Sequence, residues 1–230
     1  MDGFPYLVGL LGGGGALVTA GVATALVTTS TVARAVGVVV ALVGVAGLVP
    51  GFLGLRYVLG GKERHRDRIL DLVAWSGDEA VLDVGTGAGL LAIGAAKRVP
   101  SGRVIACDIW SAKDLSGNGI ERTQHNAAIE GVAGRVDIRT EDARRLDLED
   151  ESIDVVLSAL CFHNIPEERG RREAVGEVFR VLRPGGRVVI ADLAGVEQYA
   201  EWLKHAGCTN VEVTNAPGTF PPQKVVAASK

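Results

Sequence analysis

The hydrophobic positions of this 230-residue chain follow two patterns that meet near residue 60. Between Asp2 and Arg56 the only charged residue is Arg34. Each of the two stretches that it separates is long enough to cross a bilayer, which takes about 20 apolar residues. Farther along, charges occur throughout and the apolar positions form short runs. The pattern predicts a helical hairpin over residues 1–61 and a separate globular domain over residues 62–230.

The apolar N-terminal region is predicted to be a pair of transmembrane helices. A cleaved signal peptide is disfavoured, because the chain begins with Asp2 and has no Lys or Arg ahead of the apolar residues. Two apolar stretches joined by the polar residues 28–31 and Arg34 are instead typical of a helical hairpin whose ends share one side of the membrane. The alternative is a buried hairpin or an oligomer contact that does not cross lipid.

Small residues recur at every fourth position of the hairpin, a spacing that lets helix backbones approach closely. We expect this stripe to pack the two helices on each other, and the glycine-rich helices also allow a homo-oligomer. Pro50 and Gly51 are expected to kink or end the second helix. The residues of the stripe are Gly12, Ala16, Ala20, Thr24 and Thr28 in the first helix and Gly37 and Ala41 in the second.

Basic residues gather around the end of the second apolar stretch, at Arg56, Lys62, Arg64, Arg66 and Arg68. Because basic flanks tend to stay on the cytoplasmic side, they predict a membrane protein with a cytoplasmic globular domain. The lipid head-group surface is the partner expected for them. The net charge of −3 gives no indication of nucleic-acid binding, and the three scattered cysteines lack metal-ligand spacing.

Apolar, β-rich runs alternate with segments of helical period after residue 62, which predicts a parallel sheet with helices on both faces. Two later strand-like runs, 210–214 and 224–228, flank a connection rich in Pro and Gly, so we expect an antiparallel hairpin at the sheet edge. The expected fold class is α/β, with a doubly wound, seven-stranded, mostly parallel sheet. The first five strands are expected near 80–84, 103–107, 135–139, 153–158 and 187–192, and the helices near 64–75, 89–98, 117–131, 167–182 and 196–206.

A glycine-rich turn, with Gly85, Gly87 and Gly89, follows the first of these strands and precedes a helix. Glycine leaves room for a ligand against the main chain, and the free N–H groups of the helix start point toward it. For the glycines alone, a tight turn without a ligand is an equal alternative. Asp108 ends the next apolar run about twenty residues later, where an acidic residue binds ribose hydroxyls in nucleotide-binding folds. Together they predict a cofactor pocket.

From about Arg66 to its end, the chain resembles the class I S-adenosylmethionine-dependent methyltransferases. The resemblance implies a Rossmann-like methyltransferase fold with S-adenosyl-L-methionine as the cofactor. The segments that carry it are 81–89 as the glycine-rich first motif, Asp108 after the second strand, 141–143 after the third, 153–158 as the fourth strand, and 182–187 as the turn into the fifth.

The resemblance also implies roles for individual residues at the cofactor. Two of these residues have structural alternatives, since Asp142 is also suited to cap a turn and Ser158 to satisfy a strand end. By the resemblance, Asp83 with Gly85, Thr86, Gly87 and Gly89 would approach the methionine part, Asp108 the ribose hydroxyls, with Ile109 beside it, Asp142 and Ala143 the adenine, and Ser158 the floor beside the sulfonium.

A nicotinamide-dependent dehydrogenase is the competing nucleotide-binding class. Its fingerprint is G-x-G-x-x-G, whereas this chain has Leu90 where the last glycine would stand. The antiparallel hairpin and the position of Asp142 also favour the methyltransferase. An oxidoreductase that uses NAD is therefore the weaker alternative.

Methyl transfer from a sulfonium is an in-line displacement, so a base is needed only if the acceptor loses a proton. His163, just past the fourth strand, is the candidate base because imidazole titrates near neutrality. Its alternative is to cap the helix that begins near Pro166. Phe162 and Trp110 either wall the pocket or pack in the core. The stretch 109–119 is longer than the turn of many relatives and is expected to shape the ribose side or cover the acceptor site.

The sequence thus predicts a membrane-anchored methyltransferase with its domain on the cytoplasmic side. Its acceptor is expected to be small and lipophilic or lipid-associated, such as a phospholipid head group or a quinone precursor. A non-catalytic protein that binds S-adenosylmethionine or assists assembly stays open as an alternative. No metal site and no nucleic-acid partner are predicted.

Overall fold

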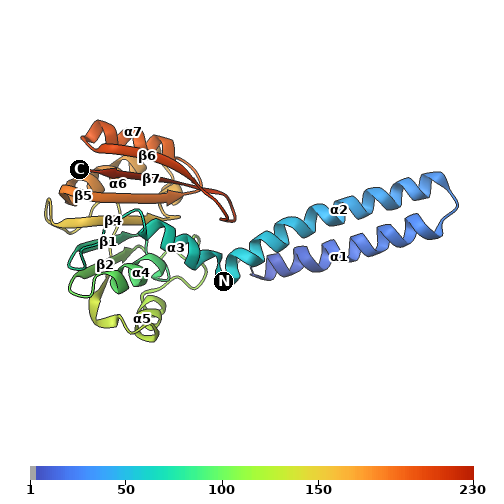
Figure 1. Cartoon of the computed structure of the whole chain (residues 1–230), viewed down its shortest axis with the longest axis horizontal. Helices are drawn as coiled ribbons and strands as arrows, with labels where there is room; N and C mark the ends of the chain where they lie inside the picture. The colour runs from blue at the N-terminus through green and yellow to red at the C-terminus, as the bar shows by residue number, and fades with distance from the viewer. Residues whose placement is uncertain (1–3) are drawn as a thin grey trace. The chain divides into compact units, whose positions relative to one another are not determined.

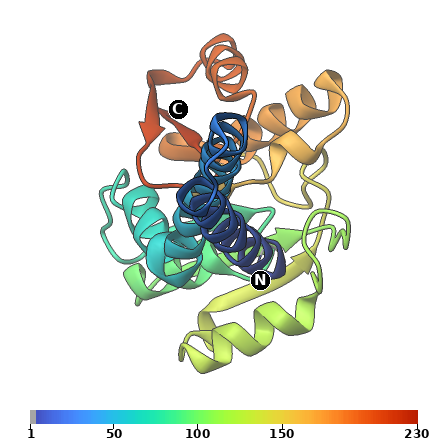
Figure 2. The same cartoon turned by 90° about the vertical axis from the view of Figure 1, so that its right-hand side faces the viewer.

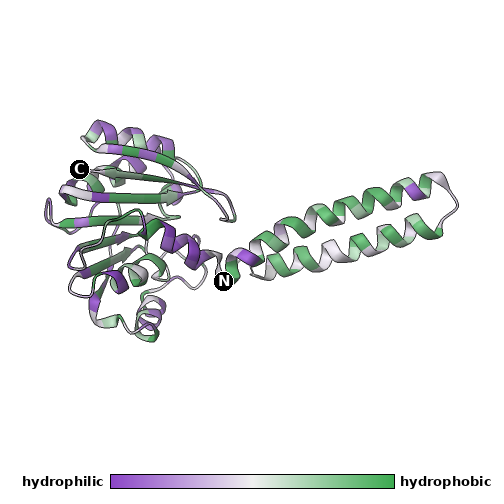
Figure 3. Ribbon diagram, viewed as in Figure 1, coloured by the Kyte–Doolittle hydropathy of each residue, from purple (hydrophilic) through white to green (hydrophobic). Residues whose placement is uncertain are grey.

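The computed structural model describes residues 4–230 and divides into two compact units, which meet at Lys62 and Glu63 (Figure 1). The first unit is a helical hairpin and the second is an α/β domain. Hydrophobic residues run along both helices of the first unit, whereas hydrophilic residues are spread over the surface helices of the second (Figure 3). The surface of the first unit is therefore mainly apolar, and the surface helices of the second unit are polar.

The first unit consists of two antiparallel helices, α1 (Phe4–Val27) and α2 (Thr31–Arg56). Ser30 caps the start of α2, where its hydroxyl accepts a hydrogen bond from a backbone N–H of the first turn at 3.4 Å. The Arg34 Nε donates to the Thr28 carbonyl oxygen at 2.9 Å, so this charged side chain is bound at the tip of the hairpin.

Pro50 lies inside α2 and does not end it. The helix continues to Arg56 and is followed by a π-helical turn, η1 (Tyr57–Gly61), and by α3 (Lys62–Leu70). Proline is tolerated within apolar helices where neighbouring groups satisfy the freed carbonyl. Of the two outcomes expected for Pro50, the end of the helix is not observed.

Glycines spaced seven residues apart bring the two backbones of the hairpin into contact. A Cβ built on Gly21 would lie 2.4 Å from the Ala41 nitrogen, and one built on Gly37 would lie 2.6 Å from the Gly21 carbonyl oxygen. A Cβ on Gly14 would lie 2.8 Å from the Gly44 carbonyl oxygen in the same way. The helices approach this closely because these glycines have no side chain.

The stripe expected at every fourth position of α1 does not form this contact. Gly12, Ala16, Ala20 and Thr24 are exposed, and a Cβ on Gly12 would meet nothing within 4 Å. Each step of four residues turns a helix by about 40°, so such a stripe winds away from a partner, whereas a seven-residue spacing keeps facing it. The packing of the two helices on each other is confirmed, but the interface predicted for α1 is wrong.

Replacing Gly37 with alanine is expected to loosen the hairpin, because the new methyl group would overlap the Gly21 carbonyl oxygen at 2.6 Å and the Ala25 nitrogen at 2.7 Å. Gly12→Ala is the matched control, since its methyl group meets nothing within 4 Å and alanine favours a helix over glycine by about 1 kcal/mol. Thermal unfolding of the full chain in detergent micelles, followed by circular dichroism, should show a lower midpoint for Gly37→Ala only. Equal midpoints for the two variants would contradict this interface.

The second unit contains seven strands. Their order in the sheet is β3-β2-β1-β4-β5-β7-β6, and β7 pairs antiparallel with both β5 and β6, while the other pairs are parallel. The expected mostly parallel sheet with an antiparallel hairpin at its edge is confirmed. The strands are β1 (Ala80–Val84), β2 (Arg103–Asp108), β3 (Val136–Thr140), β4 (Ile153–Ala159), β5 (Leu182–Asp192), β6 (Thr209–Ala216) and β7 (Gln223–Ser229).

Helices cover both faces of the sheet. The helices other than α3 are α4 (Leu90–Arg98), α5 (Ile120–Ile129), α6 (Glu168–Val181) and α7 (Val196–Ala206), with short 3₁₀ turns η2 (Ala133–Arg135) and η3 (Phe162–Asn164). The core on one face includes Leu70 of α3, Leu91 of α4 and Ala127 of α5. The core on the other face includes Val178 of α6 and Leu203 of α7. Figure 2 shows α3 in blue-green and α6 in light orange on opposite sides of the strands.

The helix expected over 64–75 ends at Leu70. Two other element boundaries differ from the expected ones for reasons seen in the contacts. β5 begins at Leu182 rather than near 187, because Leu182 pairs with Ile153 of β4 before a shift in register. α5 begins at Ile120 rather than at 117, because Asn118 in the preceding loop is bound to Asp108 at the end of β2. The loop after β2 is therefore longer than expected.

The strand order places the opening of the domain at the centre of the sheet. β1 lies between β2 and β4, so the chain builds outward from β1 on one side and then returns to build outward from β4 on the other. In doubly wound sheets such a switch point opens a crevice at the carboxyl ends of the strands. The residues that follow β1, β2 and β4 are therefore the ones that face a ligand.

Candidate functional site

Several of the residues predicted to bind the cofactor meet at the carboxyl edge of the parallel strands. Asp83 lies in β1 with Gly85 just after it, Asp108 is the last residue of β2, and Ser158 lies near the end of β4. Because β1 pairs with both β2 and β4, these three strand ends are neighbours. The predicted residues on these strands are thus brought together.

The turn after β1 requires glycine at the predicted positions. Gly85, Gly87 and Gly89 have φ values of +74°, +53° and +85°, a region that other residues rarely adopt. Space is lacking at Gly85 as well, since a Cβ there would lie 2.3 Å from the Cys161 Sγ. The Gly85 N–H donates to the Cys107 carbonyl oxygen at 2.8 Å, which fixes the turn against the end of β2.

Two side chains of α5 hold the carbonyl groups of this turn. Thr123 Oγ1 donates to the Gly87 carbonyl oxygen at 2.6 Å, and Asn126 Nδ2 donates to the Ala88 carbonyl oxygen at 2.8 Å. Neither residue was predicted from the sequence. Their signal was a pair of short polar side chains three residues apart, which lie on one face of a helix.

The Asp83 side chain stabilises the glycine-rich turn after β1 through hydrogen bonds. Its fully buried carboxylate accepts hydrogen bonds from Thr86 Oγ1 at 2.7 Å and from the Ala92 N–H at 2.9 Å. Burial raises the pKa of Asp83 to about 7, against the two hydrogen bonds, and the nearby Asp108 charge adds to the rise. A cation in the crevice would favour the ionised form.

Asp108 joins the glycine turn to the loop after β2. Its Oδ2 accepts from the Gly87 N–H at 2.8 Å, and its Oδ1 accepts from the Trp110 N–H at 2.7 Å and from Asn118 Nδ2 at 3.2 Å. Ile109 is 59% exposed, so its apolar side chain is open to solvent beside the same strand end. The contacts of Asp108 and Ile109 with a ribose stay predictions.

Asp142 is bound within its own turn. Its carboxylate accepts from the Arg144 N–H at 2.9 Å and forms an ion pair with the Arg144 guanidinium, with 2.5 Å between Oδ2 and Nη2. The hydrogen bond from Arg144 lowers the pKa of Asp142. These contacts are those of the turn cap considered as its alternative role. Ala143 packs against the core, and the contact of both residues with adenine stays a prediction.

Ser158 is buried between two strands. Its hydroxyl donates to the Val84 carbonyl oxygen at 2.8 Å and so links β4 to β1 at the base of the crevice. This bond satisfies a strand end, the alternative considered for this residue. A position beside the sulfonium stays a prediction for Ser158.

His163 is paired with a buried carboxylate that the sequence analysis missed. Its Nδ1 lies 2.5 Å from Oδ1 of Asp192, and its backbone N–H donates to the other oxygen at 3.0 Å. Asp192 is the last residue of β5 and is fully buried. It ends an apolar strand in the way that Asp108 ends β2, and this was the available signal.

The Asp192 carboxylate sets the protonation of His163. Its hydrogen bond raises the pKa of His163, partial burial acts in the opposite direction, and the charges of Asp192 and Asp114 add to the rise. Because a carboxylate only accepts hydrogen bonds, the neutral imidazole carries its proton on Nδ1. The lone pair is then on Nε2. This is the arrangement of a histidine general base that a carboxylate orients.

The two aromatic residues considered for the pocket wall have different surroundings. Phe162 is fully buried and packs edge-on against Tyr199, with 5.7 Å between ring centroids, so it belongs to the core. Trp110 is partly exposed, and its Nε1 donates to Thr140 Oγ1 at 2.8 Å across the ends of β2 and β3. Trp110 is therefore the one of the two that is placed beside the crevice.

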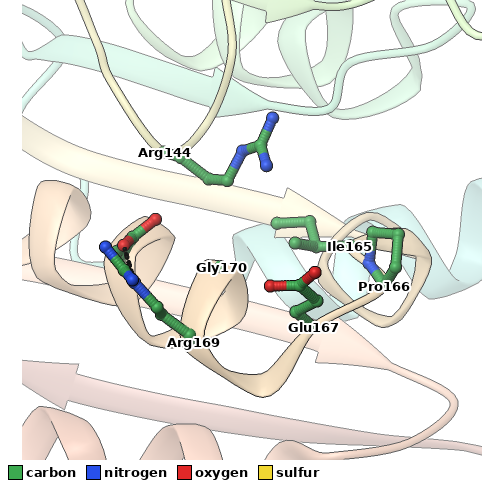
Figure 4. A pocket seen from close by; sticks show the side chains of 7 residues that line it. Arg144, Ile165, Pro166, Glu167, Arg169 and Gly170 are labelled. Carbon is green, nitrogen blue, oxygen red and sulfur yellow. Dashed lines mark hydrogen bonds and ion pairs between the residues drawn. The ribbon is translucent and has the colours of Figure 1, made fainter.

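A separate pocket of about 260 Å³ lies between the loop after β3 and the start of α6 (Figure 4). Arg144 stands on one side of it, and Glu167 and Arg169 stand on the other. Both of its arginines are already paired, since Arg144 binds Asp142 and Arg169 binds Glu173 at 2.8 Å. Across residues 4–230 no group of three or more His, Cys, Asp or Glu side chains could hold a metal ion.

Comparison with known proteins identifies the domain. Residues 81–186, which contain the glycine turn, Asp108 and Asp142, match a family model described as "Methyltransferase domain". The chain contains a methyltransferase domain. S-adenosylmethionine is the cofactor of this methyltransferase domain.

Relatives of the methyltransferase domain are known from several organisms. A ubiquinone/menaquinone biosynthesis C-methyltransferase of Geotalea daltonii is 32% identical over 114 residues, which are 50% of this chain and 45% of that protein. A demethylmenaquinone methyltransferase of Thermus thermophilus is 30% identical over 133 residues, which are 58% of this chain and 56% of that protein. The chain thus spans about half the length of these curated relatives.

Solved structures share the fold of the methyltransferase domain. A SAM-dependent methyltransferase from Aquifex aeolicus is 22% identical, with a TM-score of 0.57 over 71% of this chain and 88% of that chain. At this identity the likeness shows the fold alone. The Rossmann-like methyltransferase fold expected for the domain is confirmed.

The residues of the crevice fit S-adenosylmethionine. The glycine turn presents backbone with no Cβ at three positions, and the Asp108 carboxylate stands against it. Asn118 Oδ1, beside Asp108, is a buried acceptor without a hydrogen-bond partner among the residues that the structure describes. A backbone cradle and hydroxyl acceptors suit the ribose and amino-acid parts of this cofactor.

Proposed function

We propose that this protein is a membrane-anchored enzyme that transfers a methyl group from S-adenosylmethionine to a small lipophilic or lipid-associated acceptor, with His163 as the general base. The observation that carries the proposal is the pair of His163, which follows β4, and Asp192, in a domain that matches a methyltransferase family model. His163 lies in η3, which follows β4, and β4 pairs with β1, so the placement of these elements at one edge of the sheet supports a shared site.

The cofactor, when bound, supplies an electrophilic methyl group on a sulfonium. The residues of this chain position the cofactor and deprotonate the acceptor. Asp108 and the turn at Gly85 would hold the cofactor at the carboxyl edge of β1 and β2. His163 Nε2 takes the proton that the acceptor loses as its oxygen, nitrogen or carbon forms the new bond to the methyl carbon. Asp192 stabilises the imidazolium that results. Loss of its methyl group would convert the cofactor to a neutral thioether, and the proton passes to His163, so charge and protons balance.

The helical hairpin supports the membrane anchor. Tyr6–Val27 and Thr31–Leu70 contain apolar windows long enough to span, of which only 11% and 17% is buried within the structure. α1 has 24 residues and is therefore about 36 Å long, against about 30 Å of hydrocarbon. A surface this apolar suits lipid better than water. The basic residues that follow α2 favour a cytoplasmic domain.

The nature of the acceptor follows from the anchor and the relatives together. Two relatives are named for quinone methylation, and quinones with isoprenoid tails partition into lipid. A domain tethered at the bilayer surface meets such acceptors at a high local concentration. A quinone precursor or a phospholipid head group is therefore the acceptor class we propose.

The test is methyl transfer to acceptors presented in vesicles. The full chain is incubated with S-adenosylmethionine labelled in its methyl group, and with phospholipid vesicles that either contain or lack a demethylated quinone. We expect label in the organic-soluble fraction, and at least about 100-fold less of it when His163→Asn replaces the wild type. Label found only in water-soluble products would contradict the lipophilic acceptor. Binding of the cofactor without transfer to any fraction would favour the non-catalytic alternative.

A further inference from the structure

The loop between β2 and α5, residues 109–119, lies over the predicted cofactor crevice. Leu115 Cδ2 is 3.3 Å from the place where a Cβ of Gly87 would stand, so this loop covers the glycine turn. The loop is fixed at both ends, because the Trp110 N–H and Asn118 Nδ2 both donate to Oδ1 of Asp108. It is therefore a wall of the crevice rather than a loose connection.

The side-chain amide of Asn118 has a bonded NH2 group and, within the described part of the chain, an unbonded carbonyl oxygen. Its Nδ2 donates to Asp108 at 3.2 Å, and its backbone N–H donates to the Leu115 carbonyl oxygen at 3.0 Å. Its Oδ1 is buried and has no hydrogen-bond partner within residues 4–230. Buried acceptors are nearly always paired, so an unpaired one beside a ligand site points to a donor on the ligand.

The hydrogen bonds that Asp108 already accepts also indicate that the ribose needs a second acceptor. A carboxylate offers about four acceptor positions, and three protein donors, from Gly87, Trp110 and Asn118, already occupy Asp108. A ribose has two adjacent hydroxyl groups, and each needs an acceptor. The carboxylate has room for one of them. The second hydroxyl requires another acceptor close to the same carboxylate.

We propose that Asn118 is a second ribose-binding residue, whose Oδ1 accepts one cofactor hydroxyl while its Nδ2 holds Asp108 in place for the other. The inference rests on the proposed cofactor site. It gives the long loop after β2 a function, since this loop brings an amide acceptor to a carboxylate that is nearly saturated. Asn118 then binds the ribose in addition to holding Asp108.

The test pairs a residue deletion with a ligand deletion. S-adenosylhomocysteine and its 2′-deoxy and 3′-deoxy analogues are titrated by calorimetry into the full-length wild type and into Asn118→Ala. We expect Asn118→Ala to weaken S-adenosylhomocysteine about 5- to 10-fold, in line with one lost hydrogen bond. We expect it to weaken one of the deoxy analogues by a smaller factor, because that analogue lacks the hydroxyl that Asn118 binds and only the support of Asp108 is lost. Lys113→Ala, an exposed change in the same loop, is the control and should bind all three ligands like the wild type.

Two results would overturn the proposal. An equal loss of affinity for all three ligands would mean that Asn118 acts only by supporting Asp108 and the loop. Unchanged affinity for S-adenosylhomocysteine would mean that Oδ1 meets no part of the ligand. Failure of the wild type to bind S-adenosylhomocysteine is a different result, because it would also refute the cofactor site on which the proposal rests.

Discussion

His163→Asn is expected to lower kcat for methyl transfer by about 100- to 10,000-fold, the range found for loss of a general base. The dissociation constant of the cofactor should stay within about 2-fold, because His163 follows β4 and is not among the groups assigned to the cofactor. Asparagine keeps the backbone N–H that donates to Asp192 and removes only the imidazole. Single-turnover kinetics with the isotope-labelled cofactor measures the chemical step directly.

The pH profile tests the same base independently of the loss in rate. The base acts when neutral, and the Asp192 hydrogen bond raises the pKa of His163 above its ordinary value of about 6.5. For the wild type, kcat/KM should therefore rise with pH and level off above that raised pKa. Asp192→Asn removes the charge, so the midpoint of the rise should move to lower pH while the plateau falls. A profile that is the same in wild type, Asp192→Asn and His163→Asn would contradict the role of the pair.

Asp108→Ala is expected to raise the dissociation constant for S-adenosylmethionine at least 10-fold. A hydrogen bond to a charged group contributes about 1.5–3 kcal/mol, and the variant loses the ribose contact together with the bonds that fix Gly87 and Asn118. Calorimetric titration of the full chain gives the affinity. Asp71→Ala is the matched control, since it removes a carboxylate that is 65% exposed and pairs with Arg98 on the surface.

The two aspartate variants also separate a binding role from a general loss of charge. Asp71→Ala should bind the cofactor with the affinity of the wild type, because surface ion pairs contribute about 0–1 kcal/mol and this one is outside the crevice. If Asp108→Ala bound the cofactor equally well, the ribose assignment would be wrong. The crevice would then need another acidic residue at the same edge.

Most of the α/β domain could be predicted from the sequence because its elements are encoded locally. Apolar runs such as those of β1 and β4 are short and β-rich, and both strands form within one residue of the expected range. The antiparallel hairpin of β6 and β7 was also predictable, since no helix fits between those runs. The start of β5 was not, because Leu182 joins the strand only through its pairing with Ile153.

The contact between α1 and α2 could not be predicted from the pattern of small residues alone. Several small residues lie on each helix, so more than one stripe has the composition of an interface. Gly14 and Gly21 form the contact because their spacing matches that of Gly37 and Gly44 on the partner helix. Which stripe is used depends on both helices together, and a pattern along one helix does not contain that information.

The candidate site also contains residues that could be predicted from the sequence and residues that could not. The glycine turn and Asp108 were predictable because a strand, a turn and an acidic residue follow one another at a fixed spacing. Asp192, Thr123 and Asn118 were missed because each acts on a group that is distant in sequence or lies across a loop. Asp192 meets His163 only because β4 and β5 are neighbours in the sheet.

The most direct test of the account is equilibrium binding of two competing cofactors to the wild-type chain. S-adenosylmethionine and a nicotinamide dinucleotide are titrated separately into the full-length protein in detergent micelles. We expect saturable, one-to-one binding of S-adenosylmethionine and no saturable binding of the dinucleotide. Saturable binding of the dinucleotide in preference to S-adenosylmethionine, or no binding of S-adenosylmethionine at all, would contradict it.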